Sequence, residues 1–184
     1  MSSVHNSPNH FMVLDAISRG MKTFGKIVKE TKLDKNTVDM VINDLAAQRL
    51  IVIVEKKGFL GGKKEEFQIT ETGTRMLVAK KQELDKKFQQ FQQWYSNGQM
   101  QQLQNSMQSD RMWLPFMLFS GIMNAMFFMS MMSFMGAAMT PAETAFSGDG
   151  AGADGAGADG ATGGVEDGGG GDFGGDFGGG DFGF

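Results

Sequence analysis

The amino-acid sequence predicts a mainly α-helical chain that carries one small β-hairpin. Two observations lead to this fold class. Apolar residues recur at intervals of three and four along several segments between residues 8 and 107, which places them on one face of a helix. Between residues 51 and 69, two short runs instead flank a tip rich in lysine and glycine, which is typical of a hairpin with a long loop.

Three short helices are predicted before the hairpin, over residues 8–21, 23–29 and 34–49. The third is the clearest, because Asp34 can cap it and a single apolar stripe runs along it. That stripe consists of Val38, Val41, Ile42, Leu45 and Ala46. Two strands alone would be unstable in water, so we expect the hairpin to pack on these helices.

A long helix is predicted to follow the hairpin, over residues 71–97. Its apolar residues are separated by 7, 4, 3 and 4 positions, which is the rhythm of a coiled-coil seam. The residues predicted to join two copies of the chain along this seam are Leu77, Leu84, Phe88, Phe91 and Tyr95. The pair Asn97-Gly98 predicts a break, and a glutamine-rich helical connector is expected over residues 98–111.

Residues 112–139 contain no charged residue and nine methionines. The run exceeds the roughly 20 apolar residues that cross a bilayer as a helix, so a transmembrane helix is expected here. Lys86, Lys87 and Arg111 precede the run and only acids follow it, which predicts a membrane-associated chain whose N-terminal domain is cytoplasmic. Two alternatives remain open: a buried association helix in a soluble cytoplasmic oligomer, and an adaptable methionine-rich surface for apolar partners.

Both ends of the sequence are predicted to be disordered. Residues 1–7 are polar, and residues 140–184 are dominated by glycine, alanine and aspartate, a composition that cannot bury enough apolar surface to fold. The second segment contains three Asp-Phe-Gly triplets and no Lys or Arg, so we interpret it as a flexible acidic spacer.

Charge is distributed unevenly along the sequence. Residues 1–80 hold 13 Lys and Arg against 9 Asp and Glu, whereas residues 112–184 hold 9 acids and no Lys or Arg. A basic front part is typical of proteins that contact nucleic acid or a membrane surface. The sequence has no cysteine, which excludes disulfides and cysteine metal sites, and its two histidines are His5 and His10. Because no nucleophile–base pair and no phosphate-binding loop is found, we expect no enzyme, no cofactor, no metal and no small-molecule substrate.

Three stretches of the first 80 residues carry a family resemblance. They are Thr37-Val38 through Leu45, Gln48-Arg49-Leu50-Ile51 after it, and Ile69-Thr70-Glu71-Thr72-Gly73 after the hairpin. With these motifs, residues 8–80 resemble the winged helix-turn-helix domains of MarR-type and PadR-type regulators. The resemblance implies a regulator of transcription that binds double-stranded DNA, in which the hairpin is the wing.

The resemblance also implies where DNA would bind. The third helix would enter the major groove through Lys35, Asn36, Thr37, Met40 and Asn43. The wing would contact phosphates through Lys56, Lys57, Lys63 and Lys64. Asp39 on the helix and the glutamates of the wing would repel phosphate, so a solvated loop remains the alternative role of these lysines.

Together these features predict a dimeric, membrane-tethered transcriptional regulator. The alternative belongs to another class of protein: a winged helix that binds proteins and not DNA, on a membrane-associated or self-assembling scaffold.

Overall fold

The computed structural model describes residues 7–57 and 62–148. The predictions made for residues 1–6, for the hairpin tip at residues 58–61 and for the acidic Asp-Phe-Gly segment at residues 149–184 lie outside the described residues.

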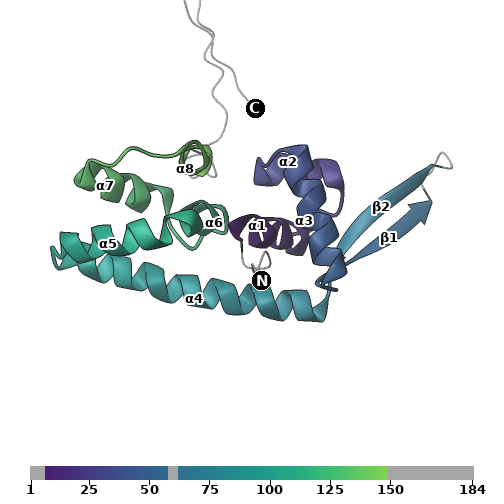
Figure 1. Cartoon of the computed structure of the whole chain (residues 1–184), viewed down its shortest axis with the longest axis horizontal. Helices are drawn as coiled ribbons and strands as arrows, with labels where there is room; N and C mark the ends of the chain where they lie inside the picture. The colour runs from purple at the N-terminus through teal and green to yellow at the C-terminus, as the bar shows by residue number, and fades with distance from the viewer. Residues whose placement is uncertain (1–6, 58–61, 149–184) are drawn as a thin grey trace, which may run out of the picture. The chain divides into compact units, whose positions relative to one another are not determined.

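Eight α-helices, one short 3-10 helix and two strands follow one another along the described part of the chain (Figure 1). They are α1 (Pro8–Ser18), α2 (Phe24–Thr31), α3 (Lys35–Ala47), β1 (Ile51–Lys57), β2 (Lys63–Ile69), α4 (Glu71–Ser96), α5 (Met100–Asp110), η2 (Arg111–Trp113), α6 (Leu114–Phe119), α7 (Ala125–Met135) and α8 (Pro141–Ser147). The strands form one antiparallel pair. The prediction of a mainly helical chain with one hairpin is confirmed.

Helix α1 lies at the centre of the core. Nine of its eleven residues are buried, and it packs against α2, α3, α4, α6 and β2. The ring of Phe11 lies 5.7 Å from that of Trp113 and 6.0 Å from that of Phe116, measured between centroids. The core beneath the first three helices therefore continues into residues 113–119.

The hairpin is anchored at its base and extends away from the helices (Figure 1). At the base, Ile51 lies opposite Ile69 and is buried with Phe67. The amide of Phe67 donates to the carbonyl of Lys22 at 2.8 Å, which joins β2 to the loop before α2. The next residues of β1 leave the core, because Val52 and Ile53 are 46% and 44% exposed.

Helix α4 occupies the segment where a long helix was predicted, but its apolar stripe does not form a free seam. Leu77, Leu84, Phe88 and Phe91 are buried within their own chain, and Phe91 and Leu84 are fully so. Tyr95 is half-buried, with its ring 5.4 Å from that of Phe127. The assignment of these five residues to a dimer interface is therefore corrected. An apolar stripe with coiled-coil spacing must be buried against other side chains, and here other helices of the same chain bury the stripe of α4.

The uncharged segment 112–139 is divided, and the prediction of one continuous helix there is also corrected. Helix α6 ends before Gly121, whose φ of 75° is left-handed, and Asn124 then caps α7 by accepting a hydrogen bond from the Met126 amide at 2.7 Å. Gly136, with a φ of 61°, ends α7. The two glycines lie where helices end because glycine adopts left-handed backbone freely, and Asn124 begins a new helix because asparagine is a preferred N-cap. Among the residues described, no helix has both the length and the apolar character needed to cross a membrane.

A last helix, α8, lies within the segment predicted to be disordered from residue 140 onward. The Thr140 hydroxyl accepts from the Glu143 amide, and the Glu143 carboxylate accepts from the Thr140 amide at 2.6 Å, which is a complete capping box. Arg111, expected to flank a membrane helix, instead donates to the buried carboxylate of Glu143 at 3.1 and 3.2 Å. The prediction of disorder is therefore wrong for residues 141–147.

Candidate nucleic-acid interface

The start of α3 is fixed by a side-chain cap. Asp34 accepts a hydrogen bond from the Thr37 amide at 2.9 Å and another from the Thr37 hydroxyl at 2.5 Å. The hydrogen bond from the Thr37 hydroxyl is the largest cause that holds the pKa of the Asp34 carboxyl below its ordinary value of 3.8, and the bond from the Thr37 amide lowers it further. Thr37, predicted to face DNA bases, is half-buried and uses its hydroxyl for this cap.

The cap should make the stability of α3 depend on pH. Because the pKa of Asp34 is lowered by folding, its stabilising contribution is complete above the unfolded value near 3.8 and is lost as the pH falls through the folded value. The variant Asp34→Asn keeps a capping oxygen but does not titrate. We expect the wild-type protein to lose free energy of unfolding relative to Asp34→Asn on acidification below pH 3.8, as followed by urea unfolding. Parallel pH profiles would contradict this role of Asp34.

The remaining predicted contacts on α3 share one exposed face. Lys35, Asn36, Met40 and Asn43 are all exposed, and Met40 retains 53% of its surface. The opposite face is buried through the predicted apolar stripe, with Ala46 only partly covered. Asp39 shares the exposed face, and its carboxylate accepts a hydrogen bond from the Asn43 amide group at 3.4 Å. The face therefore offers amide, ammonium and thioether groups, together with one carboxylate.

The four lysines of the hairpin are all exposed and form two neighbouring cross-strand pairs, Lys56 with Lys64 and Lys57 with Lys63. The ammonium of Lys56 lies 2.8 Å from the carboxylate of Glu66, and that of Lys63 lies 3.2 Å from Glu55. For the other two lysines, no ion pair is found within the described residues. The hairpin thus presents two ammonium groups that are paired with glutamates, on Lys56 and Lys63, and two that are not, on Lys57 and Lys64.

One further cation beside the hairpin was missed at the level of the sequence. Lys22 is exposed in the loop before α2, and its carbonyl is the acceptor for β2. Its positive charge lowers the pKa of Glu66, although the hydrogen bond from Lys56 is the larger cause. The signal in the sequence that could have indicated this cation is the regular recurrence of lysine at positions 22, 26, 29, 32 and 35.

The position of the hairpin relative to α3 is set by Thr70. Its hydroxyl lies 2.9 Å from the carbonyl oxygen of Arg49 and 3.0 Å from that of Leu50, and it accepts from the Gly73 amide at 3.1 Å. Arg49 has a φ of 59°, and the Leu50 amide returns to the Leu45 carbonyl at 2.9 Å, which closes α3 with a left-handed cap. One threonine therefore joins the end of α3, the start of β1 and the start of α4.

The exposed face of α3 and the hairpin are thus connected through the hydrogen bonds of Thr70. In the described part of the chain, no group of three or more His, Cys, Asp or Glu side chains is placed to hold a metal ion. Comparison of the chain with protein-family models, with curated proteins and with solved structures found no match.

Proposed function

We propose that the chain is a transcriptional regulator that binds double-stranded DNA through a winged helix-turn-helix of the MarR or PadR type. In this proposal α2 and α3 are the helix-turn-helix and β1–β2 is the wing. The exposed face of α3 enters the major groove, and the lysines of the wing contact the phosphate backbone.

The observation that carries the proposal is the pairing of two different surfaces on one frame. The face of α3 exposes asparagine amides, which suit base edges, while the hairpin exposes lysines, which suit phosphates. Thr70 joins the segment after α3 to the base of the hairpin and the start of α4. Recognition of a duplex requires both kinds of surface, one that reads base edges and one that positions the protein on the phosphate backbone.

The proposal includes a homodimer but no membrane tether. Two copies would read two half-sites on the duplex. Their contact lies outside the apolar stripe of α4, because that stripe is buried in its own chain. Residues 114–119, which were expected to enter a bilayer, are part of the core beside α1.

We test DNA binding with two variants that change the net charge equally. Lys57→Gln with Lys64→Gln removes two uncompensated charges of the wing, and Lys86→Glu changes the net charge by the same amount at an exposed site on α4. We expect the double variant to lower affinity for a 20-base-pair duplex about tenfold and to reduce the salt slope of log K by about two, since each phosphate contact contributes roughly 0.9. Fluorescence anisotropy at several salt concentrations measures both quantities, and Lys86→Glu should leave them close to wild type.

A second function is favoured by a different observation. Met40, Val52 and Ile53 are exposed apolar side chains on α3 and β1, and two of the four hairpin lysines are already paired with glutamates. These features suit a surface that binds a protein. If the wild-type chain binds the duplex weakly and without salt dependence, or if the two charge variants bind it equally well, the protein-interaction module replaces the DNA-binding regulator.

A further inference from the structure

A small cavity of about 60 Å³ is lined by α5, by η2, by the start of α6 and by the end of α7. Three of its lining residues are methionines: Met107 on α5, and Met132 and Met135 on α7. This volume is far below the roughly 300–1,000 Å³ of sites for organic ligands, whereas a single water needs only about 15 Å³. The cavity therefore has the size for an ion and not for an organic molecule.

Two helices bring the three methionines to this cavity. Met132 and Met135 are three residues apart, which places them on one side of α7. On α5, Met107 shares one side with Gln104 and Gln108, which also line the cavity. Met107 and Met132 are each 4% exposed, and Met135 is half-buried, whereas both glutamines are exposed. The methionines therefore form the buried part of the lining, and the glutamines mark its open side.

The chain that follows α7 closes the cavity at one edge. Gly136 ends the helix, and the amide of Ala137 donates to the Met132 carbonyl at 3.2 Å. Ala137 itself lines the cavity. The Arg111 guanidinium donates to the carbonyl of Ala138 at 2.6 Å, which joins this turn to η2.

The lining carries almost no net charge. Arg111 is its one charged residue in the described chain, and the guanidinium of Arg111 donates to the buried carboxylate of Glu143 at 3.1 and 3.2 Å. No carboxylate lines the cavity within residues 7–57 and 62–148. Because the cost of taking an ion out of water rises steeply with its charge, such a lining favours a monovalent cation over a divalent one.

Thioether sulfur selects a particular kind of metal ion. It is neutral and polarisable, and soft ligands of this kind favour Cu(I). The sequence has no cysteine, so no thiolate competes for such an ion. Thioethers also differ from the His, Cys, Asp and Glu side chains, of which the described residues contain no suitable group of three.

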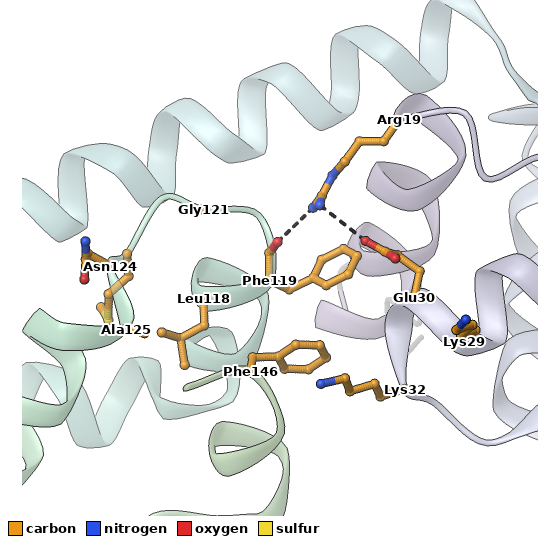
Figure 2. A pocket seen from close by; sticks show the side chains of 11 residues that line it. Arg19, Lys29, Glu30, Lys32, Leu118, Phe119, Gly121, Asn124, Ala125 and Phe146 are labelled. Atoms are coloured by element: carbon orange, nitrogen blue, oxygen red, sulfur yellow. Dashed lines mark hydrogen bonds and ion pairs between the residues drawn. The ribbon is translucent and has the colours of Figure 1, made fainter. Parts of the chain in front are cut away.

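The larger cavity of about 570 Å³ that Figure 2 shows does not share these features. Arg19, Lys29 and Lys32 line it, and Met123 is the one methionine in its lining over the described ranges. The three positive side chains would repel a metal cation, and a single thioether offers it too few ligands. Several thioethers and a nearly neutral lining therefore occur together at the smaller cavity.

We propose that the small cavity binds one Cu(I) ion through the thioether sulfurs of Met107, Met132 and Met135. Gln104 and Gln108 form its entrance, and the bound ion joins α5 to α7. The proposal goes beyond the proposed function, because it uses no residue of α3 or of the hairpin and requires no DNA.

Competition with a coloured chelator measures this binding on the full chain. Bicinchoninate forms a coloured complex with Cu(I) under ascorbate and without oxygen, and a protein that takes up Cu(I) removes the colour. We expect the chain to take up one equivalent, and an about tenfold excess of Zn(II) not to displace it, because Zn(II) prefers imidazole, thiolate and carboxylate ligands. Undiminished colour, or displacement by Zn(II), overturns the proposal.

Variants of methionine to leucine provide a matched comparison, since leucine has a similar volume and no sulfur. Met107→Leu and Met132→Leu each remove a lining thioether, and Met126→Leu removes one that is 75% exposed on α7 and does not line the cavity. We expect each lining variant to weaken Cu(I) binding at least about tenfold, and Met126→Leu to change it less than about twofold. His5→Gln, which removes an imidazole, should also leave it within about twofold. Equal effects of Met132→Leu and Met126→Leu contradict the site.

Nuclear magnetic resonance of the methionine methyl groups locates the ion. Ag(I) serves as the probe, because it is soft and monovalent like Cu(I) and needs no reductant. We expect the largest methyl shifts at Met107, Met132 and Met135, and little change at Met126 and Met129, which are 75% and 42% exposed on α7. Shifts spread equally over the exposed methionines would show unspecific binding to thioethers and overturn the assignment.

Discussion

Replacing Gly73 with alanine should lower the free energy of unfolding by about 3 kcal/mol, the upper part of the usual range for overpacking. A Cβ atom at this position would lie 2.2 Å from the carbonyl oxygen of Leu50 and 3.0 Å from Cγ1 of Ile69. The Leu50 carbonyl cannot move away cheaply, because it accepts from the Thr70 amide at 2.9 Å and lies 3.0 Å from the Thr70 hydroxyl. Urea unfolding followed by far-ultraviolet circular dichroism measures the loss.

The control for this variant is Gly25→Ala. Gly25 lies in the first turn of α2, and a Cβ there would meet no atom within 4 Å. The same chemical change should therefore be neutral or stabilise the fold by up to about 1 kcal/mol, through reduced freedom of the unfolded chain. If Gly73→Ala is as well tolerated as Gly25→Ala, the close approach of α4 to β1 does not hold in solution.

The local signals in the sequence predicted much of the first 80 residues correctly in position. Asp34 caps α3 where a cap was expected, and α4 begins directly after Thr70. These features depend on side chains that bond to the backbone a few residues away, so they can be recognised in a linear sequence. The placement of the exposed residues of α3 and of the hairpin lysines follows from the same local rules.

The partners of the apolar stripes could not be predicted in this way. The spacing from Leu77 to Phe91 indicates a face that must be buried, but periodicity does not tell which surface buries it. Here the cover comes from the same chain, and Phe127 packs against both Phe88 and Tyr95, at 5.3 and 5.4 Å between ring centroids. Phe127 lies more than 30 residues from Phe88 and from Tyr95 in the sequence, so a local pattern does not predict these contacts.

The uncharged segment after residue 111 misled for a related reason. Absence of charge is shared by a membrane helix and by the interior of a folded domain, and length alone favoured the first. Gly121, Asn124 and Gly136 were the signals for breaks. The sequence Thr140-Pro141-Ala142-Glu143 likewise contained the signature of a capping box, and the glycine-rich low complexity of residues 148–184 concealed it.

Replacing Glu143 with alanine should also lower the free energy of unfolding by about 3 kcal/mol, because it removes one partner of a buried ion pair. The Glu143 side chain is fully buried and accepts two hydrogen bonds from Arg111 and one from the Thr140 amide. The Arg111 side chain is 42% exposed, so water can solvate part of it, which places the cost at the lower end for such pairs. For a domain of this size, the loss corresponds to a fall in Tm of roughly 6–12 °C, measurable by calorimetry.

Two further variants separate the effect of breaking this buried ion pair from the effect of removing a charge. Glu71→Ala removes an acid of the same type from an exposed pair with Arg75, and should cost less than about 1 kcal/mol. Arg111→Ala and Glu143→Ala both remove the two hydrogen bonds between these side chains, so the double variant should lose less than the sum of the two single losses. Additive losses in the double variant would mean that Arg111 and Glu143 do not act as a pair.

The same substitution tests whether α8 supports the proposed DNA-binding surfaces. Helix α8 carries both Glu143 and Phe146, and the ring of Phe146 meets that of Phe119 with centroids 5.5 Å apart. The exposed face of α3 and the hairpin take no support from α8, since Thr70, Gly73 and the base of β1 hold them. We therefore expect duplex binding by Glu143→Ala to match wild type at temperatures where the chain remains folded, and a loss of duplex binding would show that α8 supports these surfaces through the shared core around α1.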